Sequence, residues 1–130
     1  MTSQTTPTLT LISGSEPAAT GGAITNGDYT LTSIIYYNTE AGYFPKTLFQ
    51  INAPYYHRTN LYFSPEDPNG SPTDGDEETG TFLTTATGFV EAWHNCNGFG
   101  DGNRASSYTA TGNAIQYYFD SQTIFVYTRQ

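Results

Sequence analysis

Residues 26–38 have the sequence NGDYTLTSIIYYN, and this stretch decides the fold class. Asn26-Gly27-Asp28 has the composition of a tight turn. The residues after it, Tyr29–Asn38, are mostly β-branched or aromatic, which is typical of a β-strand. Similar segments follow along the chain, and none shows the helical period or the start and stop signals of a helix. The sequence therefore predicts an all-β protein.

Eight strands are predicted between Tyr29 and the C-terminus, most of them linked by short turns. Short connections favour an antiparallel up-and-down meander. Eight strands are enough to close into a barrel, and closure removes the free edges of a sheet that has few charged residues. We expect an eight-stranded antiparallel barrel, with a two-sheet β-sandwich as the alternative. The predicted strands are Tyr29–Asn38, Lys46–Asn52, Tyr55–Ser64, Thr81–Ala86, Phe89–Cys96, Arg104–Thr111, Asn113–Phe119 and Gln122–Arg129.

The chain divides into an N-terminal segment and a barrel domain. Residues 1–25 are rich in Thr, Ser, Pro and Gly, so we expect a flexible arm or linker before a domain at 26–130. Within the arm, Thr8–Ile12 alternates and is able to pair with a sheet edge, including an edge of a neighbouring subunit. Pro65–Thr79 and Asn97–Asn103 are predicted to be exposed loops that gate the barrel.

Charge and composition exclude several partners. The net charge is −8, and the four basic residues Lys46, Arg58, Arg104 and Arg129 form no cluster. A face that neutralises phosphates cannot be built from them, so we expect neither nucleic acid nor membrane insertion. The single cysteine, Cys96, allows no intrachain disulfide. Only 12% of the residues are charged, a composition that favours a secreted or cell-envelope protein whose leader is not present in this chain.

The segment Gly27-Asp28-Tyr29 resembles the opening of the first lipocalin strand, where the family has Gly-x-Trp. In lipocalins an Arg on the last strand packs across that Trp, and Arg129 stands at the corresponding end of this chain. Thr79–Phe82, Tyr108–Asn113 and the ending Val126–Gln130 are similar to short lipocalin-like domains of exported bacterial lipoproteins. The resemblance covers residues 26–130 and implies a small calycin-type barrel that binds a ligand in its lumen. Tyr29 in place of Trp and the lack of a C-terminal helix depart from the classical pattern.

Alternation along the strands predicts which residues line the lumen. If Tyr29 points inward, then Ile35 and Tyr37 do so too, whereas Ile34 and Tyr36 point outward. Aromatic side chains with a few polar groups suit a flat or moderately apolar ligand, and a fully packed core is the alternative. The predicted ligand-binding residues are Tyr29, Ile35, Tyr37, Tyr55, Trp93, Tyr117 and Tyr127.

Three groups of residues could carry other chemistry. Glu91 beside Trp93 is a potential acid or base, but an exposed carboxylate on the outer wall is the simpler interpretation. His57, His94 and Cys96 have the chemistry of metal ligands without an identifiable fourth. The acids of the 65–79 loop allow a weak calcium site, although Pro72 breaks the EF-hand pattern. We assign no catalytic residue, no metal ligand and no cofactor.

The sequence thus predicts an exported barrel that binds a small apolar or aromatic ligand. Two alternatives remain open. One is a structural protein that self-associates through the N-terminal arm. The other is a cofactor-free barrel enzyme of the cyclase or isomerase type, which acts by shaping its substrate.

Overall fold

The computed structural model describes residues 6–96 and 100–130, which form nine strands and no helix. Their bounds are β1 Thr8–Ile12, β2 Gly27–Tyr37, β3 Phe44–Asn52, β4 Tyr55–Phe63, β5 Asp74–Thr84, β6 Gly88–Asn95, β7 Gly100–Thr111, β8 Ala114–Asp120 and β9 Thr123–Arg129.

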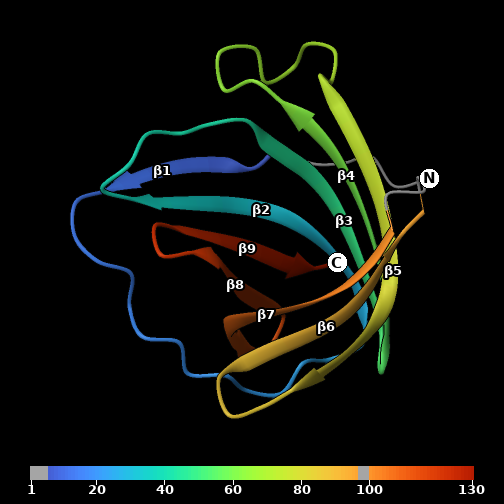
Figure 1. Cartoon of the computed structure of the whole chain (residues 1–130). Helices are drawn as coiled ribbons and strands as arrows, with labels where there is room; N and C mark the ends of the chain where they lie inside the picture. Colours follow the sequence, from blue (N-terminus) through green and yellow to red (C-terminus); the bar gives the residue numbers. More distant parts are fainter. Residues whose placement is uncertain (1–5, 97–99) are drawn as a thin grey trace.

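The strands β2 to β9 form a closed antiparallel barrel in which each strand pairs with the next one along the chain (Figure 1). The barrel closes where β2 pairs with β9, from Tyr29 opposite Arg129 to Tyr36 opposite Thr123. The predicted eight-stranded meander is therefore confirmed. The ninth strand, β1, lies parallel to the second half of β2, with Thr8 opposite Ser33.

Two predicted loops are shorter in the structure. β5 begins at Asp74, so residues 74–79 of the predicted 65–79 loop belong to the barrel wall. β7 begins at Gly100, which places residues 100–103 of the second predicted loop in a strand, while residues 97–99 lie outside the described residues. Acidic and glycine residues disfavour strands by propensity. Here the inward carboxylates of β5 have partners inside the barrel, and this tertiary pairing overrides the propensity.

A β-bulge at Thr32 changes which residues of β2 face inward. Leu31 is opposite Tyr127 and Ser33 is opposite Val126, so Thr32 is an extra residue in the ladder with β9. An inserted residue reverses the alternation that follows it. The expected outward direction of Ile34 and Tyr36 is therefore wrong. Both are buried, and Tyr36 faces the lumen.

One end of the barrel, which we call the closed end, carries the hairpins at 52–55, 84–88 and 111–114. Residues 20–27 run across this end. Gly21 N–H donates to the Tyr108 carbonyl, and the Tyr108 hydroxyl donates to the Gly22 carbonyl at 2.6 Å. The Tyr29 hydroxyl donates to the Thr25 carbonyl at 2.6 Å. A Cβ on Gly21 would lie 2.0 Å from the Ala86 carbonyl oxygen, so only glycine permits this approach.

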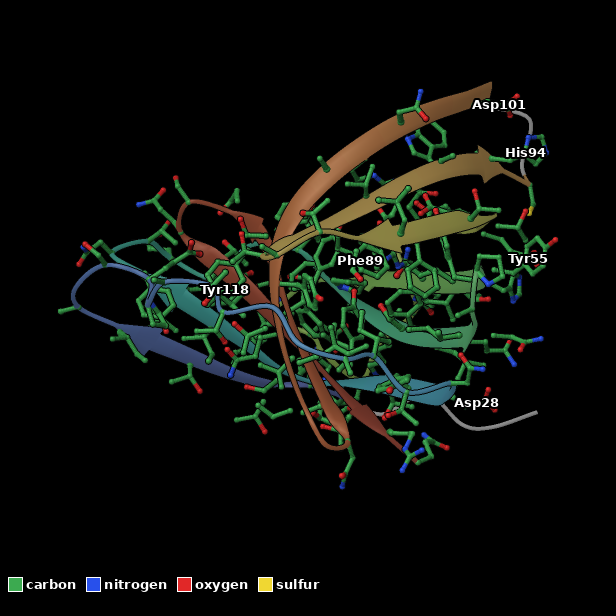
Figure 2. All side chains as sticks on the ribbon, turned by 90° about the horizontal axis from the view of Figure 1, so that it is seen from below. Asp28, Tyr55, Phe89, His94, Asp101 and Tyr118 are labelled. Carbon is green, nitrogen blue, oxygen red and sulfur yellow. The ribbon has the colours of Figure 1, made fainter. Side chains whose placement is uncertain are left out.

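The half of the barrel next to the closed end is filled by aromatic and aliphatic side chains. Phe89 lies at its centre, with no exposed surface and ring contacts to Phe49, Phe82, Tyr108 and Tyr117. Figure 2 shows Phe89 among the interior side chains, whereas Tyr55, His94 and Asp101 lie at the margin of the molecule. This packing supplies most of the apolar burial that stabilises the fold.

Candidate functional site

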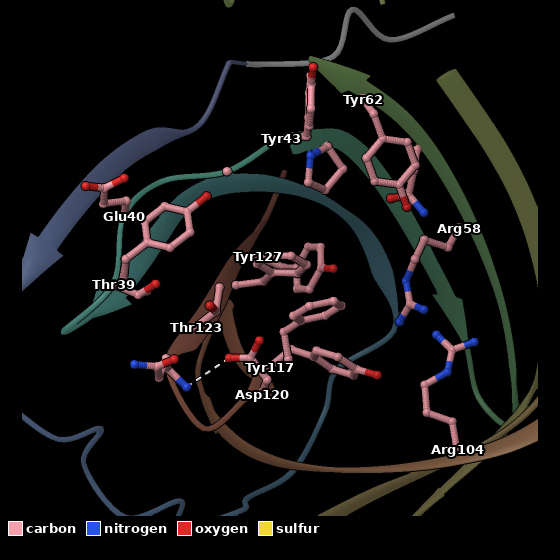
Figure 3. A pocket seen from close by; sticks show the side chains of 17 residues that line it. Thr39, Glu40, Tyr43, Arg58, Tyr62, Arg104, Tyr117, Asp120, Thr123 and Tyr127 are labelled. Carbon is pink, nitrogen blue, oxygen red and sulfur yellow. Dashed lines mark hydrogen bonds between the residues drawn. The ribbon is translucent and has the colours of Figure 1, made fainter. Parts of the chain in front are cut away.

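The opposite, open end of the barrel contains a cavity of about 380 Å³ (Figure 3). The ladder between β7 and β8 covers only Tyr108–Thr111 and Ala114–Tyr117, so the remaining parts of these strands do not close the wall here. The 38–43 loop and the turn between β8 and β9 border the mouth. The lining residues are Tyr36, Thr39, Glu40, Gly42, Tyr43, Pro45, Arg58, Asn60, Tyr62, Arg104, Tyr117, Phe119, Asp120, Gln122, Thr123, Phe125 and Tyr127.

The floor of the cavity is a ring of four charged side chains, Arg58, Glu78, Arg104 and Glu91. Arg58 donates to Glu78 at 2.8 Å and to Glu91 at 2.7 Å. Arg104 contacts the other oxygens of the same two carboxylates: it donates to Glu78 at 2.9 Å and forms an ion pair with Glu91 at 3.2 Å. Each arginine therefore bridges both carboxylates, and the formal charge of the ring is zero.

Three members of the ring are buried, Arg104 is partly exposed, and two tyrosine hydroxyls complete the ring. Glu91 is fully buried and Arg58 is 4% exposed. Tyr56 O–H donates to Glu78 at 3.0 Å and Tyr117 O–H donates to Glu91 at 3.1 Å. Burial, followed by the charge of Glu91, raises the pKa of Tyr56 and Tyr117, so both phenols stay protonated and act as donors. Buried charges that are paired and hydrogen-bonded in this way hold one defined arrangement.

A second group of hydrogen bonds lines the wall between β3, β4 and β5. Thr47 donates to the Asn60 side-chain oxygen at 2.7 Å, and the Asn60 amide donates to Asp76 at 2.8 Å. Tyr62 O–H donates to the other oxygen of Asp76 at 3.3 Å. Burial first and Asp76 second raise the pKa of Tyr62 to about 12. This wall offers fixed polar groups beside aromatic surface, the combination that orients small ligands in protein pockets.

The aromatic residues of the open end form the rest of the lining. The Phe119 and Phe125 rings stack with centroids 5.0 Å apart, and Phe125 also contacts Tyr127 edge-on. Tyr43 and Phe119 stand at the mouth and are 69% and 59% exposed. Large apolar side chains that remain exposed beside a cavity are typical of a ligand-binding site. The arrangement therefore suits a small molecule with a flat apolar body.

The structure brings together two of the seven residues that the sequence predicts for ligand binding, since Tyr117 and Tyr127 both line the cavity. Tyr29 is buried at the closed end, and the bulge in β2 places Tyr36 in the lining rather than Ile35 or Tyr37. The remaining two lie elsewhere. Tyr55 is 61% exposed, and Trp93 packs beneath the Arg104 guanidinium, whose carbon lies 5.4 Å from the ring centre.

Sequence reasoning missed the charged floor. Glu91 was expected on the outer wall and Glu78 in a loop, but both point into the barrel. No direction is predicted for Arg58 from the sequence, and in the structure its side chain points into the barrel. A usable signal was present. Arg58 is two residues from both Tyr56 and Asn60, so the three side chains lie on the same face of β4. In the structure all three are buried.

The residues considered as metal ligands do not meet. His57 lies between Gln50 and Glu77, at 2.9 and 2.6 Å, and His94 pairs with Asp101, while Cys96 is exposed. The acids considered for calcium alternate between the two faces of β5, because Asp76 and Glu78 point inward and Glu77 pairs with His57 outside. Within residues 6–96 and 100–130 no group of three or more such side chains could hold a metal ion.

No protein-family model, curated protein or solved structure matches this sequence. The architecture is compatible with a lipocalin-like barrel, and the expected Tyr29 and Arg129 are register partners at the closed end. The aliphatic part of Arg129 packs over Gly27, where a Cβ would lie 2.8 Å from Arg129 Cδ. In the parts of the chain that the structure describes, there is no helix long and apolar enough to cross a membrane.

Proposed function

We propose that this protein is a small-ligand-binding barrel and that its site is the cavity at the open end. The observation that carries the proposal is the contrast between a filled interior and an unfilled one in the same barrel. Phe49, Phe89 and Tyr108 are essentially fully buried near the closed end, whereas about 380 Å³ remains between Arg58 and the mouth. A volume of this size accommodates a compact organic molecule.

The lining defines the kind of ligand. The rings of Tyr36, Phe125 and Tyr127 offer apolar surface, and Asn60 and Tyr62 offer hydrogen bonds at fixed positions. A flat, moderately apolar molecule with a few polar groups matches both. Export to the cell envelope or the medium belongs to the same proposal, and it is supported by the low share of charged residues, 12%.

A neutral, apolar fluorescent dye tests the proposal directly. We expect Nile red to bind with a stoichiometry of one per chain, at the cavity of the open end. Thr123→Phe adds a ring inside the cavity from the start of β9, and we expect it to weaken binding at least tenfold. Equilibrium titration of the dye fluorescence measures both quantities.

The matched control is Thr128→Phe, the same substitution on the outward face of β9, where the Thr128 hydroxyl contacts Thr32. This variant is expected to bind the dye as the unmodified protein does. Urea unfolding of both variants establishes that each is folded. Absence of dye binding to the unmodified protein, or equal loss in both variants, would show that the cavity is not a ligand site.

A further inference from the structure

One polar atom on the cavity floor has no partner. Arg58 Nη1 and Nη2 donate to Glu78 and Glu91, but Arg58 Nε is buried and makes no hydrogen bond. The residue is only 4% exposed and its side chain lines the cavity (Figure 3). An N–H donor that is buried without an acceptor is destabilising, so an acceptor that reaches this atom from the cavity is favoured.

The remaining charges of the cavity are negative. The two arginines of the floor are each paired with Glu78 and Glu91, which leaves Glu40 and Asp120 as the other charged lining residues. Glu16 lies near Asp120, and burial together with that carboxylate raises the pKa of Glu16. The aromatic faces of the lining also attract cations and repel anions. An anionic group in this cavity would therefore be unfavourable despite the two arginines.

Together these observations indicate a ligand with two different ends. We propose that the cavity takes a small flat molecule whose inner end carries an uncharged hydrogen-bond acceptor for Arg58 Nε–H and whose outer end carries a protonated amine near Glu40 and Asp120. The inner acceptor is uncharged because the floor ring is already neutral and Glu91 is fully buried beside it. This inference rests on the proposed function and adds the chemical class of the ligand.

Three para-substituted benzenes of similar size test each end separately. They are para-acetylbenzylamine, with a ketone and an amine; para-ethylbenzylamine, which lacks the ketone; and para-acetylbenzoate, which replaces the amine by a carboxylate. We expect para-acetylbenzylamine to bind most tightly. Loss of the ketone weakens binding about tenfold through the Arg58 hydrogen bond. Replacing the amine by a carboxylate, as in para-acetylbenzoate, weakens binding at least tenfold at low salt. Titrations followed by protein NMR measure all three dissociation constants.

A pair of double variants tests the amine end on the protein side. Glu40→Gln with Asp120→Asn is expected to weaken para-acetylbenzylamine binding about threefold to tenfold. The matched control, Asp28→Asn with Asp101→Asn, removes two exposed carboxylates outside the cavity and is expected to leave para-acetylbenzylamine binding unchanged. The effect of the first pair should decline with added salt, because exposed charges are screened.

The outcomes separate this inference from the proposed function. Tighter binding of para-acetylbenzoate, or equal binding with and without the ketone, overturns the two-ended ligand while the cavity remains a binding site. Nile red binding in a protein that binds none of the three benzenes also overturns it. Failure of the dye and of all three benzenes removes the proposed function itself.

Discussion

The two halves of the barrel are built from the same strands but differ in what fills them. Toward the closed end, Phe49, Phe89 and Tyr108 are essentially fully buried and meet in edge-on ring contacts. Toward the open end, aromatic residues of β2, β4, β8 and β9 face a cavity of about 380 Å³. The comparison shows that strand number does not decide whether a small barrel is hollow. The side chains at each level of the barrel decide it.

The charged ring separates the two halves. Arg58 lies over the Phe49 ring, with its guanidinium carbon 4.3 Å from the ring centre, so one face of the ring of charges touches the packed core. The other face lines the cavity through Arg58 and Arg104. A buried ion-pair network contributes little net stability compared with apolar packing, but it fixes the positions of its members. We infer that the ring provides a defined polar floor for the ligand site.

The largest effect is expected from Phe89→Ala, which should lower the free energy of unfolding by about 3–5 kcal/mol because it opens a void in the packed half. Phe125→Ala makes the same change in the hollow half, where the ring already borders the cavity, and should cost about 1 kcal/mol. Urea unfolding measures both values. Equal losses would mean that the two halves do not differ in packing.

Glu91→Gln removes one charge from the ring that separates the two halves. It leaves the buried Arg58 and the partly exposed Arg104 with less compensating charge, and we expect a loss of about 3 kcal/mol in the same unfolding measurement. Glu77→Gln is the matched control on the outer wall, where the side chain is half exposed and pairs with His57; it should cost less than about 1 kcal/mol. A small effect of Glu91→Gln would show that the two arginines do not depend on this carboxylate for compensating charge.

The smallest effect concerns alkaline pH. The pKa of Tyr62 is raised to about 12 from an ordinary value near 10. Between these two values the unfolded chain has released the Tyr62 proton and the folded protein still holds it, so stability falls as pH rises through this window. Tyr62→Phe should make the decline less steep in urea unfolding between pH 9 and 12, values that bracket this window. An unchanged slope would contradict the assignment of this pKa to Tyr62.

Much of the fold was accessible from the sequence. The short links around Gly88 and Gly112 each connect segments of strand composition, so the number and order of barrel strands follow from local chemistry. The expected turn at Asn26–Asp28 is wrong, because Gly27 and Asp28 already belong to β2 and pair with β3. The pairing of Tyr29 with Arg129, where β2 meets β9, was also predictable, because the two residues stand near the start of the first predicted strand and the end of the last one.

The site was less accessible because it depends on contacts between distant residues. Nothing local marks Thr32 as the bulged residue of β2, yet that single insertion decides whether Tyr36 or Tyr37 faces the lumen. Likewise, Glu78 has the local context of an acidic loop, and its place inside the barrel becomes favourable only when Arg58 and Arg104 lie opposite. The residue pattern of one strand does not show which side chain of another strand will lie opposite it.

The pairing of β2 with β9 has a consequence for how the chain folds. The seam joins the first barrel strand to the last, so Tyr29 and Arg129 are paired across nearly the whole length of the barrel domain in sequence. Contacts between residues so far apart in sequence carry a large loop-closure entropy, which slows folding to the millisecond-to-second range typical of such topologies. On a ribosome the barrel cannot close until β9 has emerged. Until then β2 keeps one edge unpaired, so the period before closure is the stage of greatest risk for aggregation.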